Sequence, residues 1–125
     1  MRSEFSSEEK LYRKIRPLEA FWDPERNRPT SGAFKDKRGL SVDRQGDRND
    51  QEALQALDEH LPQEGNVISV SYQQCLDIDV EVMYLPIPEN EYHSELHDSP
   101  QCVPLSRSKA KRLSEMANII ETCGS

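Results

Sequence analysis

The chain contains no long apolar run. No stretch of about 18 consecutive apolar residues occurs in it, so the sequence predicts no membrane-spanning helix. Hydrophobic residues make up 34% of its 125 residues, against about 45–50% in ordinary soluble domains. This shortage leaves enough apolar material for one core of modest size. The sequence therefore predicts a single small domain with long polar loops.

Cysteines are few and form no recognisable pattern. Cys75, Cys102 and Cys123 are odd in number and lie 27 and 21 residues apart, which fits neither a disulfide-rich scaffold nor a Cys-x-x-Cys site. Residues 1–5 (MRSEF) lack the apolar stretch of a secretory signal and are too acidic for a transit peptide. We therefore expect reduced cysteines and a cytoplasmic protein.

Basic residues are missing from the middle of the chain. Residues 51–104 contain 11 Asp and Glu and no Lys or Arg, whereas the whole chain has a formal charge of −7. Such a segment repels phosphate and attracts cations or basic protein surfaces. We therefore expect a partner with a basic surface, and no direct contact with nucleic acid. The residues expected to dock on it are Asp77, Asp79, Glu81, Glu89 and Glu91.

Glycine motifs for nucleotide binding are also absent. The five glycines are scattered and form neither a Gly-x-Gly-x-x-Gly fingerprint nor a P-loop. No Gly-x-Ser-x-Gly elbow supports Ser-His-Asp catalysis. The sequence therefore predicts no cofactor and contains no complete catalytic motif.

Apolar residues at helical spacing predict two helices. The first runs from about residue 51 to 61 and the second from about 107 to 122. Asn49 or Asp50 is expected to cap the first helix, and Ser106 the second, which Gly124 would end.

Four segments are typical of strands: residues 10–15, 40–42, 66–72 and 76–85. The fold expected is α+β, a small antiparallel sheet packed with two helices, spanning residues 10–123 after a flexible N-terminus of residues 1–9. The expected core consists of Leu11, Ile15, Phe34, Leu54, Leu57, Val67, Ile68, Ile78, Val80, Val82, Leu113, Met116 and Ile120.

The alternation of apolar and acidic residues is clearest between residues 76 and 85. One face carries Leu76, Ile78, Val80 and Val82, and the other Asp77, Asp79 and Glu81. This period predicts a strand with one buried and one solvated face. Its carboxylates could coordinate a hard cation or simply be solvated. Pro86 and Pro88 are expected to end the sheet and begin a polar loop that reaches residue 105.

Two sets of polar residues are candidate sites. His93 and His97 would meet on one face of a helix, with Cys102 as a further metal ligand, unless both histidines are solvated in a polar loop. Arg13 on a short strand could hold a pyrophosphate, as in dinucleotide-binding domains that include ADP-ribosyl-transfer folds, because a guanidinium is planar and permanently charged. Alternatively, Arg13 pairs with an acidic residue on a neighbouring strand.

Four segments together resemble a family of small bacterial proteins. They are residues 11–17 (LYRKIRP), 28–34 (RPTSGAF), 40–43 (LSVD), and Asn90 with His93. The family pattern reads LYRxIxP, RPSSAAF, LSVD and NPAH, followed by a C-terminal helix. Thr30, Gly32 and Glu91-Tyr92 depart from it. The resemblance implies a bacterial, cytosolic protein and draws attention to the polar motif positions Arg13, Ser31, Ser41 and His93.

Two hypotheses for function follow. The first is a non-catalytic protein-interaction module or accessory subunit with an acidic docking surface, whose binding would weaken as salt screens the charges. The second is a small enzyme or a nucleotide- or anion-binding domain with a pocket around Arg13, Ser31 and His93. There Arg13 would hold an anion, Ser31 would supply a hydrogen bond, and His93 would act as an acid or base.

Overall fold

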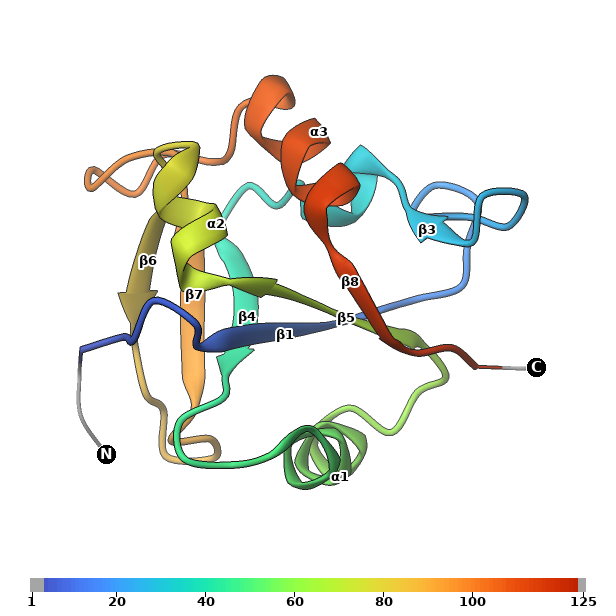
Figure 1. The fold of residues 1–125 in the computed structure, drawn as a ribbon, viewed down its shortest axis with the longest axis horizontal. Helices are drawn as coiled ribbons and strands as arrows, with labels where there is room; N and C mark the ends of the chain where they lie inside the picture. The colour runs from blue at the N-terminus through green and yellow to red at the C-terminus, as the bar shows by residue number, and fades with distance from the viewer. Residues whose placement is uncertain (1–3, 124–125) are drawn as a thin grey trace.

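The structure, a computed structural model, describes residues 4–123 and is built on one antiparallel sheet (Figure 1). Its six strands lie in the order β6-β7-β4-β1-β5-β8. Their bounds are β1 Lys10–Ile15, β4 Leu40–Arg44, β5 Asn66–Ser71, β6 Glu81–Tyr84, β7 His93–His97 and β8 Asn118–Glu121. β1 lies inside the sheet, where it pairs with β4 on one side and β5 on the other.

Helices cover both faces of this sheet. Helix α1 (Asp50–His60) lies on one face, and α2 (Tyr72–Asp77) and α3 (Arg107–Met116) lie on the other (Figure 1). The short 3-10 helix η1 (Ser31–Phe34) packs against α3. A separate two-stranded ribbon joins β2 (Trp22–Asp23) to β3 (Arg28–Pro29). The α+β class is therefore confirmed, with a third helix, α2, that the sequence did not predict.

Each face of the sheet has its own apolar core because successive residues of a strand point to opposite faces. Leu11 and Tyr12 are adjacent in β1 and both fully buried, yet they belong to different cores. Leu11 packs in the larger one, beneath α2 and α3, and Tyr12 packs with Leu57 of α1. Of the expected core residues, only Leu54, Val82, Met116 and Ile120 are partly rather than fully buried.

Both expected helix starts are confirmed. The Asn49 side chain accepts from the backbone N–H of Glu52, whose carboxylate accepts in return from the N–H of Asn49, so the two residues form a capping box. The Ser106 hydroxyl caps α3 in the same way, accepting from the N–H of Lys109 at 3.2 Å.

The strand expected over residues 76–85 is wrong in its first half. Ser71 and Gln74 form a second capping box, which ends β5 and begins α2. Leu76 therefore lies on a helix and is 44% exposed, whereas Ile78 and Val80 are buried. Asp77, Asp79 and Glu81 consequently do not share a strand face: only Glu81 belongs to β6.

The polar loop expected over residues 86–105 is interrupted by β7. Inside it, His93–His97 pairs with β4 on one side and β6 on the other. Its inward residues, Ser94 and Leu96, are fully buried, and this alternation is hidden in the sequence by two histidines and a glutamate.

The last helix is also shorter than expected. It ends at Met116, and residues 118–121 continue as the edge strand β8 beside β5. The β-branched pair Ile119 and Ile120 favours a strand over a helix. Gly124, the expected helix stop, lies outside the described residues.

Residues 4–9 lead into β1 and touch the rest of the domain. Phe5 stacks on Tyr72 with ring centroids 5.0 Å apart, and Glu9 is buried. Residues 1–3 of the segment expected to be flexible lie outside the described residues. Within residues 4–123, no helix has the length and apolar character needed to cross a bilayer.

Candidate functional site

A groove runs along the face of the sheet that α1 covers, between α1 and the segment 85–92. Its volume is about 380 Å³. Its polar lining comes from separate parts of the chain: Arg13 from β1, Ser41 and Asp43 from β4, Asn90 from the loop, and His93 from β7. We refer to this feature as the α1 groove.

Ser41 and His93 are neighbours in the α1 groove. Strands β4 and β7 pair so that Ser41 lies opposite Glu95 and Asp43 opposite His93. The hydroxyl oxygen of Ser41 lies 3.4 Å from Nε2 of His93, and the carbonyl oxygen of Leu85 lies 2.9 Å from Nδ1. A carbonyl only accepts, so Nδ1 carries the proton, and Nε2 of the neutral ring is left to accept from Ser41.

Arg13 lies where β1 and β4 separate. Their pairing covers only two positions, Leu11 with Arg44 and Tyr12 with Asp43. Beyond them the Arg13 side chain donates from Nη1 to the carbonyl of Ser41 (2.8 Å) and from Nε to the carbonyl of Ala33 (2.9 Å). The guanidinium thus replaces the missing strand pairing and is fixed beside Ser41.

The charge of Arg13 is not balanced by an ion pair. No carboxylate among residues 4–123 lies within ion-pair distance of it, and both of its hydrogen bonds go to neutral carbonyls. Burial lowers the pKa of Arg13, and the negative charge of Asp36 opposes this shift. An arginine nevertheless stays protonated, so the α1 groove contains a permanent, partly buried positive charge.

The carboxylate of Asp43, also in the groove, is only partly satisfied by hydrogen bonds. The residue is 8% exposed, and its Oδ1 accepts from the side-chain amide of Asn90 at 2.9 Å. Its other oxygen, Oδ2, is buried and has no hydrogen-bond partner among residues 4–123. An unsatisfied buried polar group costs about 1–3 kcal/mol. This arrangement stabilises the 90–93 turn against β4 and leaves one acceptor unused.

Three of the four segments that carry the family resemblance line the α1 groove, and the fourth, residues 28–34, contacts Arg13 through Ala33. Arg13 bonds to Ala33 and Ser41, and Ser41 contacts His93. Asp43, in the same segment as Ser41, holds Asn90. Residues up to 52 positions apart in the sequence are thus in direct contact.

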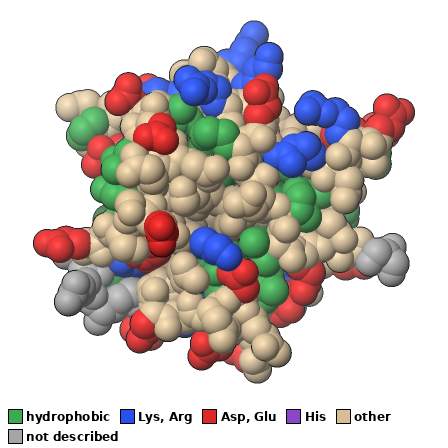
Figure 2. All heavy atoms as spheres, in the orientation of Figure 1, with side chains coloured by type: hydrophobic (Ala, Val, Ile, Leu, Met, Phe, Trp, Pro, Cys, Tyr) green, Lys and Arg blue, Asp and Glu red, His purple; other side chains and the backbone are tan. Residues whose placement is uncertain are grey.

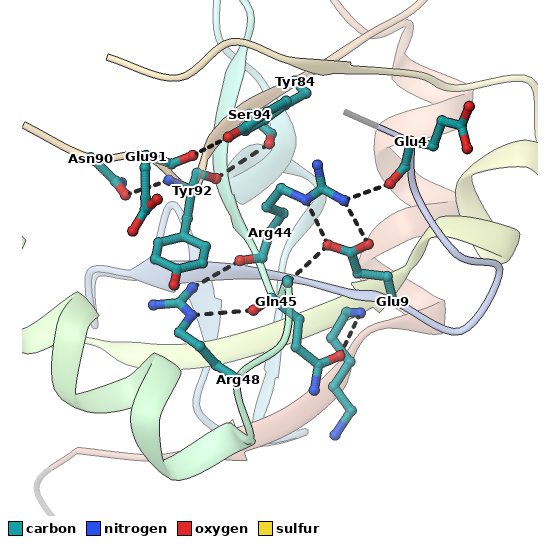
Figure 3. Close-up of polar contacts among 12 residues, drawn as sticks. Glu4, Glu9, Arg44, Gln45, Arg48, Tyr84, Asn90, Glu91, Tyr92 and Ser94 are labelled. Carbon is teal, nitrogen blue, oxygen red and sulfur yellow. Dashed lines mark hydrogen bonds and ion pairs between the residues drawn. The ribbon is translucent and has the colours of Figure 1, made fainter. Parts of the chain in front are cut away.

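Beside the α1 groove lies a second polar cluster around Arg44 (Figure 3). The Arg44 guanidinium donates to both carboxylate oxygens of Glu9, at 2.7 and 2.9 Å, and it lies over the rings of Phe5 and Tyr84. Burial on its own would raise the pKa of Glu9, but the hydrogen bonds from Arg44 and from the N–H of Gly46 outweigh it and lower the pKa. This cluster is internally paired, so it stabilises the fold and does not call for a ligand.

Arg48 links the two regions. Its guanidinium lies 3.5 Å above the centre of the Tyr92 ring and donates to the carbonyls of Arg44 and Gln45 (Figure 3). The Tyr92 backbone N–H donates to the side chain of Asn90. The loop that forms one wall of the α1 groove is therefore held against β4 and α1.

The residues expected to form one pocket are only partly together. Arg13 and His93 both line the α1 groove, but Ser31 begins η1 and is not among the lining residues. Ser41, ten residues further along the chain, occupies the place expected for Ser31. The expected acidic partner of Arg13 is replaced by two backbone carbonyls.

The expected acidic docking residues fall into two groups. Asp77 ends α2, Asp79 lies in the turn that follows, and Glu81 begins β6. Glu89 and Glu91 lie in the loop beyond the other end of β6. All except Glu81 are exposed. On the face drawn in Figure 2, acidic side chains are spread around the outline and form no single patch. Asp98, a further acidic residue of the segment 51–104, pairs with Lys109 of α3 at 3.6 Å.

The helix on which the metal interpretation depended is absent. His93 and His97 lie four residues apart on β7, which separates them by about 13 Å along a strand. His97 is 2% exposed and its Nε2 is bonded to Glu95, while Cys102 is exposed in a loop and contacts Met83. Among the described residues, no group of three or more His, Cys, Asp or Glu side chains could hold a metal ion.

Comparisons with protein-family models, curated proteins and solved structures found no match to this chain. The resemblance to the bacterial family therefore stays a prediction, and any function has to be argued from the site.

Proposed function

We propose that this chain is a binding protein for a small anionic molecule, which it holds in the α1 groove. The observation that supports the proposal is Arg13, a partly buried cation whose hydrogen-bond partners are the neutral carbonyls of Ala33 and Ser41. Buried charges in proteins are normally paired, because desolvation of an unpaired ion is costly. A phosphate or carboxylate group of a ligand would supply the missing partner.

The attraction for an anion comes from Arg13 rather than from the summed charge of the lining. Lys14 also lines the α1 groove, but its ammonium is paired with Asp58 at 2.9 Å, and the carboxylates of Asp43 and Glu89 belong to the same lining. Exposed charges are screened over about 8–10 Å at ordinary ionic strength. Solvent therefore weakens the effect of the exposed carboxylate of Glu89, whereas Arg13 acts at hydrogen-bond distance on an anion that it holds.

The remaining lining residues favour a ligand with an organic portion over a simple inorganic ion. Leu57, Leu61 and Ile87 provide apolar walls. Ser41 and Asn90 provide hydrogen-bonding groups on the floor and at the rim. A volume of about 380 Å³ falls within the range of about 300–1,000 Å³ typical of small-molecule sites. We therefore propose an organic phosphate or carboxylate of nucleotide size or smaller.

Titration calorimetry with pyrophosphate and with adenosine diphosphate tests this proposal. We expect Arg13→Met to weaken binding about tenfold or more, because a hydrogen bond to a charged group contributes about 1.5–3 kcal/mol. Arg28→Met is the matched control, since Arg28 also donates to backbone carbonyls, at the end of α3, but is not a groove residue. Equal binding by native protein and Arg13→Met, with both folded, would contradict the proposal.

A second candidate, docking on a basic protein surface, is supported by a different observation. Residues 51–104 lack Lys and Arg, and Asp77, Asp79, Glu89 and Glu91 are exposed. A partner bound this way would be released as salt rises. Charge reversal of Asp77 and Asp79 should then act differently from reversal of Glu89 and Glu91, because the two pairs lie at opposite ends of β6. Binding that is unchanged by salt and by both reversals would exclude this mode.

A further inference from the structure

The α1 groove contains a serine whose hydroxyl faces an unprotonated imidazole nitrogen. We propose that Ser41 is a nucleophile and His93 its general base, so that the groove transfers acyl groups from small anionic esters or thioesters. The anionic character of the substrate rests on the proposed function, whereas the nucleophile itself rests on the geometry of Ser41 and His93.

The tautomer of His93 gives the direction of proton transfer. Nδ1 donates to the carbonyl of Leu85 at 2.9 Å, so the lone pair of the neutral ring is on Nε2, 3.4 Å from Oγ of Ser41. A base whose far nitrogen is held by an acceptor is the arrangement that activates serine in nucleophilic catalysis. The distance of 3.4 Å is long for a hydrogen bond, and such contacts often shorten only when substrate is bound.

Rigid backbone holds both side chains. Ser41 and His93 lie on adjacent strands, β4 and β7, both inside the six-stranded sheet. The carbonyl that orients His93 belongs to Leu85, whose own N–H donates to the carbonyl of His93 at 3.1 Å. Sites built on strands keep their geometry better than sites on loops.

Arg13 lies beside the proposed nucleophile and can bind the anionic group of the substrate. Arg13 lines the same groove, and its guanidinium is bonded to the backbone carbonyl of Ser41 between β1 and β4. It would hold the substrate's anionic group beside Ser41, so that binding also orients the reacting carbonyl.

The reaction balances with water as the only co-reactant. Oγ of Ser41 forms a bond to the acyl carbon while its proton passes to Nε2 of His93. The bond between the acyl carbon and the leaving oxygen or sulfur breaks, and His93 returns the proton to that leaving group. A water molecule, deprotonated by Nε2 of His93, then attacks the acyl carbon of the acyl-serine. The bond between that carbon and Oγ breaks, the carboxylic acid leaves, and His93 returns the proton to Oγ of Ser41.

Labelling with a fluorophosphonate, a neutral reagent that does not need anion recognition, tests the nucleophile directly. Peptide mapping should find one phosphonyl adduct on Ser41, formed with release of fluoride, and Ser41→Ala should not be labelled. His93→Ala should lower the labelling rate about 100-fold or more, and added imidazole should restore part of it. Ser31→Ala is the matched control and should be labelled like the native chain.

The proposal is overturned if Ser41 is not labelled, or if His93→Ala is labelled as fast as the native protein. Calorimetry of Ser41→Ala with pyrophosphate keeps this result separate from the proposed function. Anion binding without labelling would refute the nucleophile and leave the binding function standing. Labelling of Ser41 without anion binding would support the nucleophile and refute the anionic ligand.

Discussion

Three arginines of this chain are bound in three different ways. Arg44 is paired with the carboxylate of Glu9. Arg28 donates to the carbonyls of Ser114, Glu115 and Ala117 at the end of α3, where the helix dipole is negative. Arg13 donates to two carbonyls in a groove. Of these three arginines, Arg13 alone combines an open groove with the absence of a negative partner, which is why we assign the ligand to it.

The pair of Glu9 and Arg44 should dominate the acid stability of the fold. Glu9→Gln removes the carboxylate charge beside a buried guanidinium, so we expect the free energy of unfolding to fall by about 3 kcal/mol. Because the pKa of Glu9 is lowered in the folded state, its contribution is present above the ordinary pKa of glutamate, about 4.3, and is lost as pH falls below it.

Urea unfolding between pH 3 and pH 7 measures this effect. The native protein should lose stability as pH falls toward pH 3, and Glu9→Gln should depend less on pH. Glu8→Gln, a change at the exposed neighbouring residue, should follow the native curve. Two parallel curves for native protein and Glu9→Gln would show that the ion pair does not contribute as argued.

Individual site residues could be predicted only in part. Arg13 and His93 stood out as polar residues in motif segments, and both line the α1 groove. Ser31 and Ser41 could not be told apart for this role, because that depends on the strand to which each belongs. Ser41 lies on β4 beside β7, whereas Ser31 lies in η1 on the side of α3.

At the scale of elements, capping residues predicted the helix starts correctly, whereas the alternation of apolar and polar residues did not distinguish strands from helices reliably. The caps of α1 and α3 are fixed by residues within four positions of each other. The alternation after residue 76 fits either one strand or the end of a helix followed by a strand. The capping box of Ser71 and Gln74 favours the helix. β7 was missed because His93, Glu95 and His97, which alternate with Ser94 and Leu96, are typical of a polar loop.

The turn before β4 should tolerate no side chain. Gly39 has φ of 103°, and a Cβ there would lie 2.5 Å from Cε1 of His97 and 2.7 Å from Oε1 of Glu95. Gly39→Ala therefore combines backbone strain with a clash against β7, and we expect a loss of about 2–4 kcal/mol in unfolding free energy. Thermal and urea unfolding measure it.

Gly46→Ala is the matched control because Gly46 also has a positive φ, 63°, but in the left-handed helical region. There alanine costs about 1–2 kcal/mol. If Gly39→Ala is no more destabilising than Gly46→Ala, the close packing of β7 against this turn is not important for stability.

At the scale of the whole molecule, the class of fold followed from composition and periodicity, and the strand order did not. The central strand β1 pairs with β4 and β5, and the paired residues are 31 to 61 positions apart along the chain. Such contacts depend on packing against α1 and α3 rather than on any local pattern. The same long-range pairing brings the motif segments together at the α1 groove and divides the acidic residues between the two ends of β6.

The most direct test of the central claim is an amide ¹H–¹⁵N correlation spectrum recorded during titration with pyrophosphate. If the α1 groove is the anion site, shifts should be confined to Ser41, Asp43, Asn90, His93 and their neighbours, and Arg13→Met should abolish them. Shifts centred on another part of the surface, or the same shifts in Arg13→Met, would contradict the account.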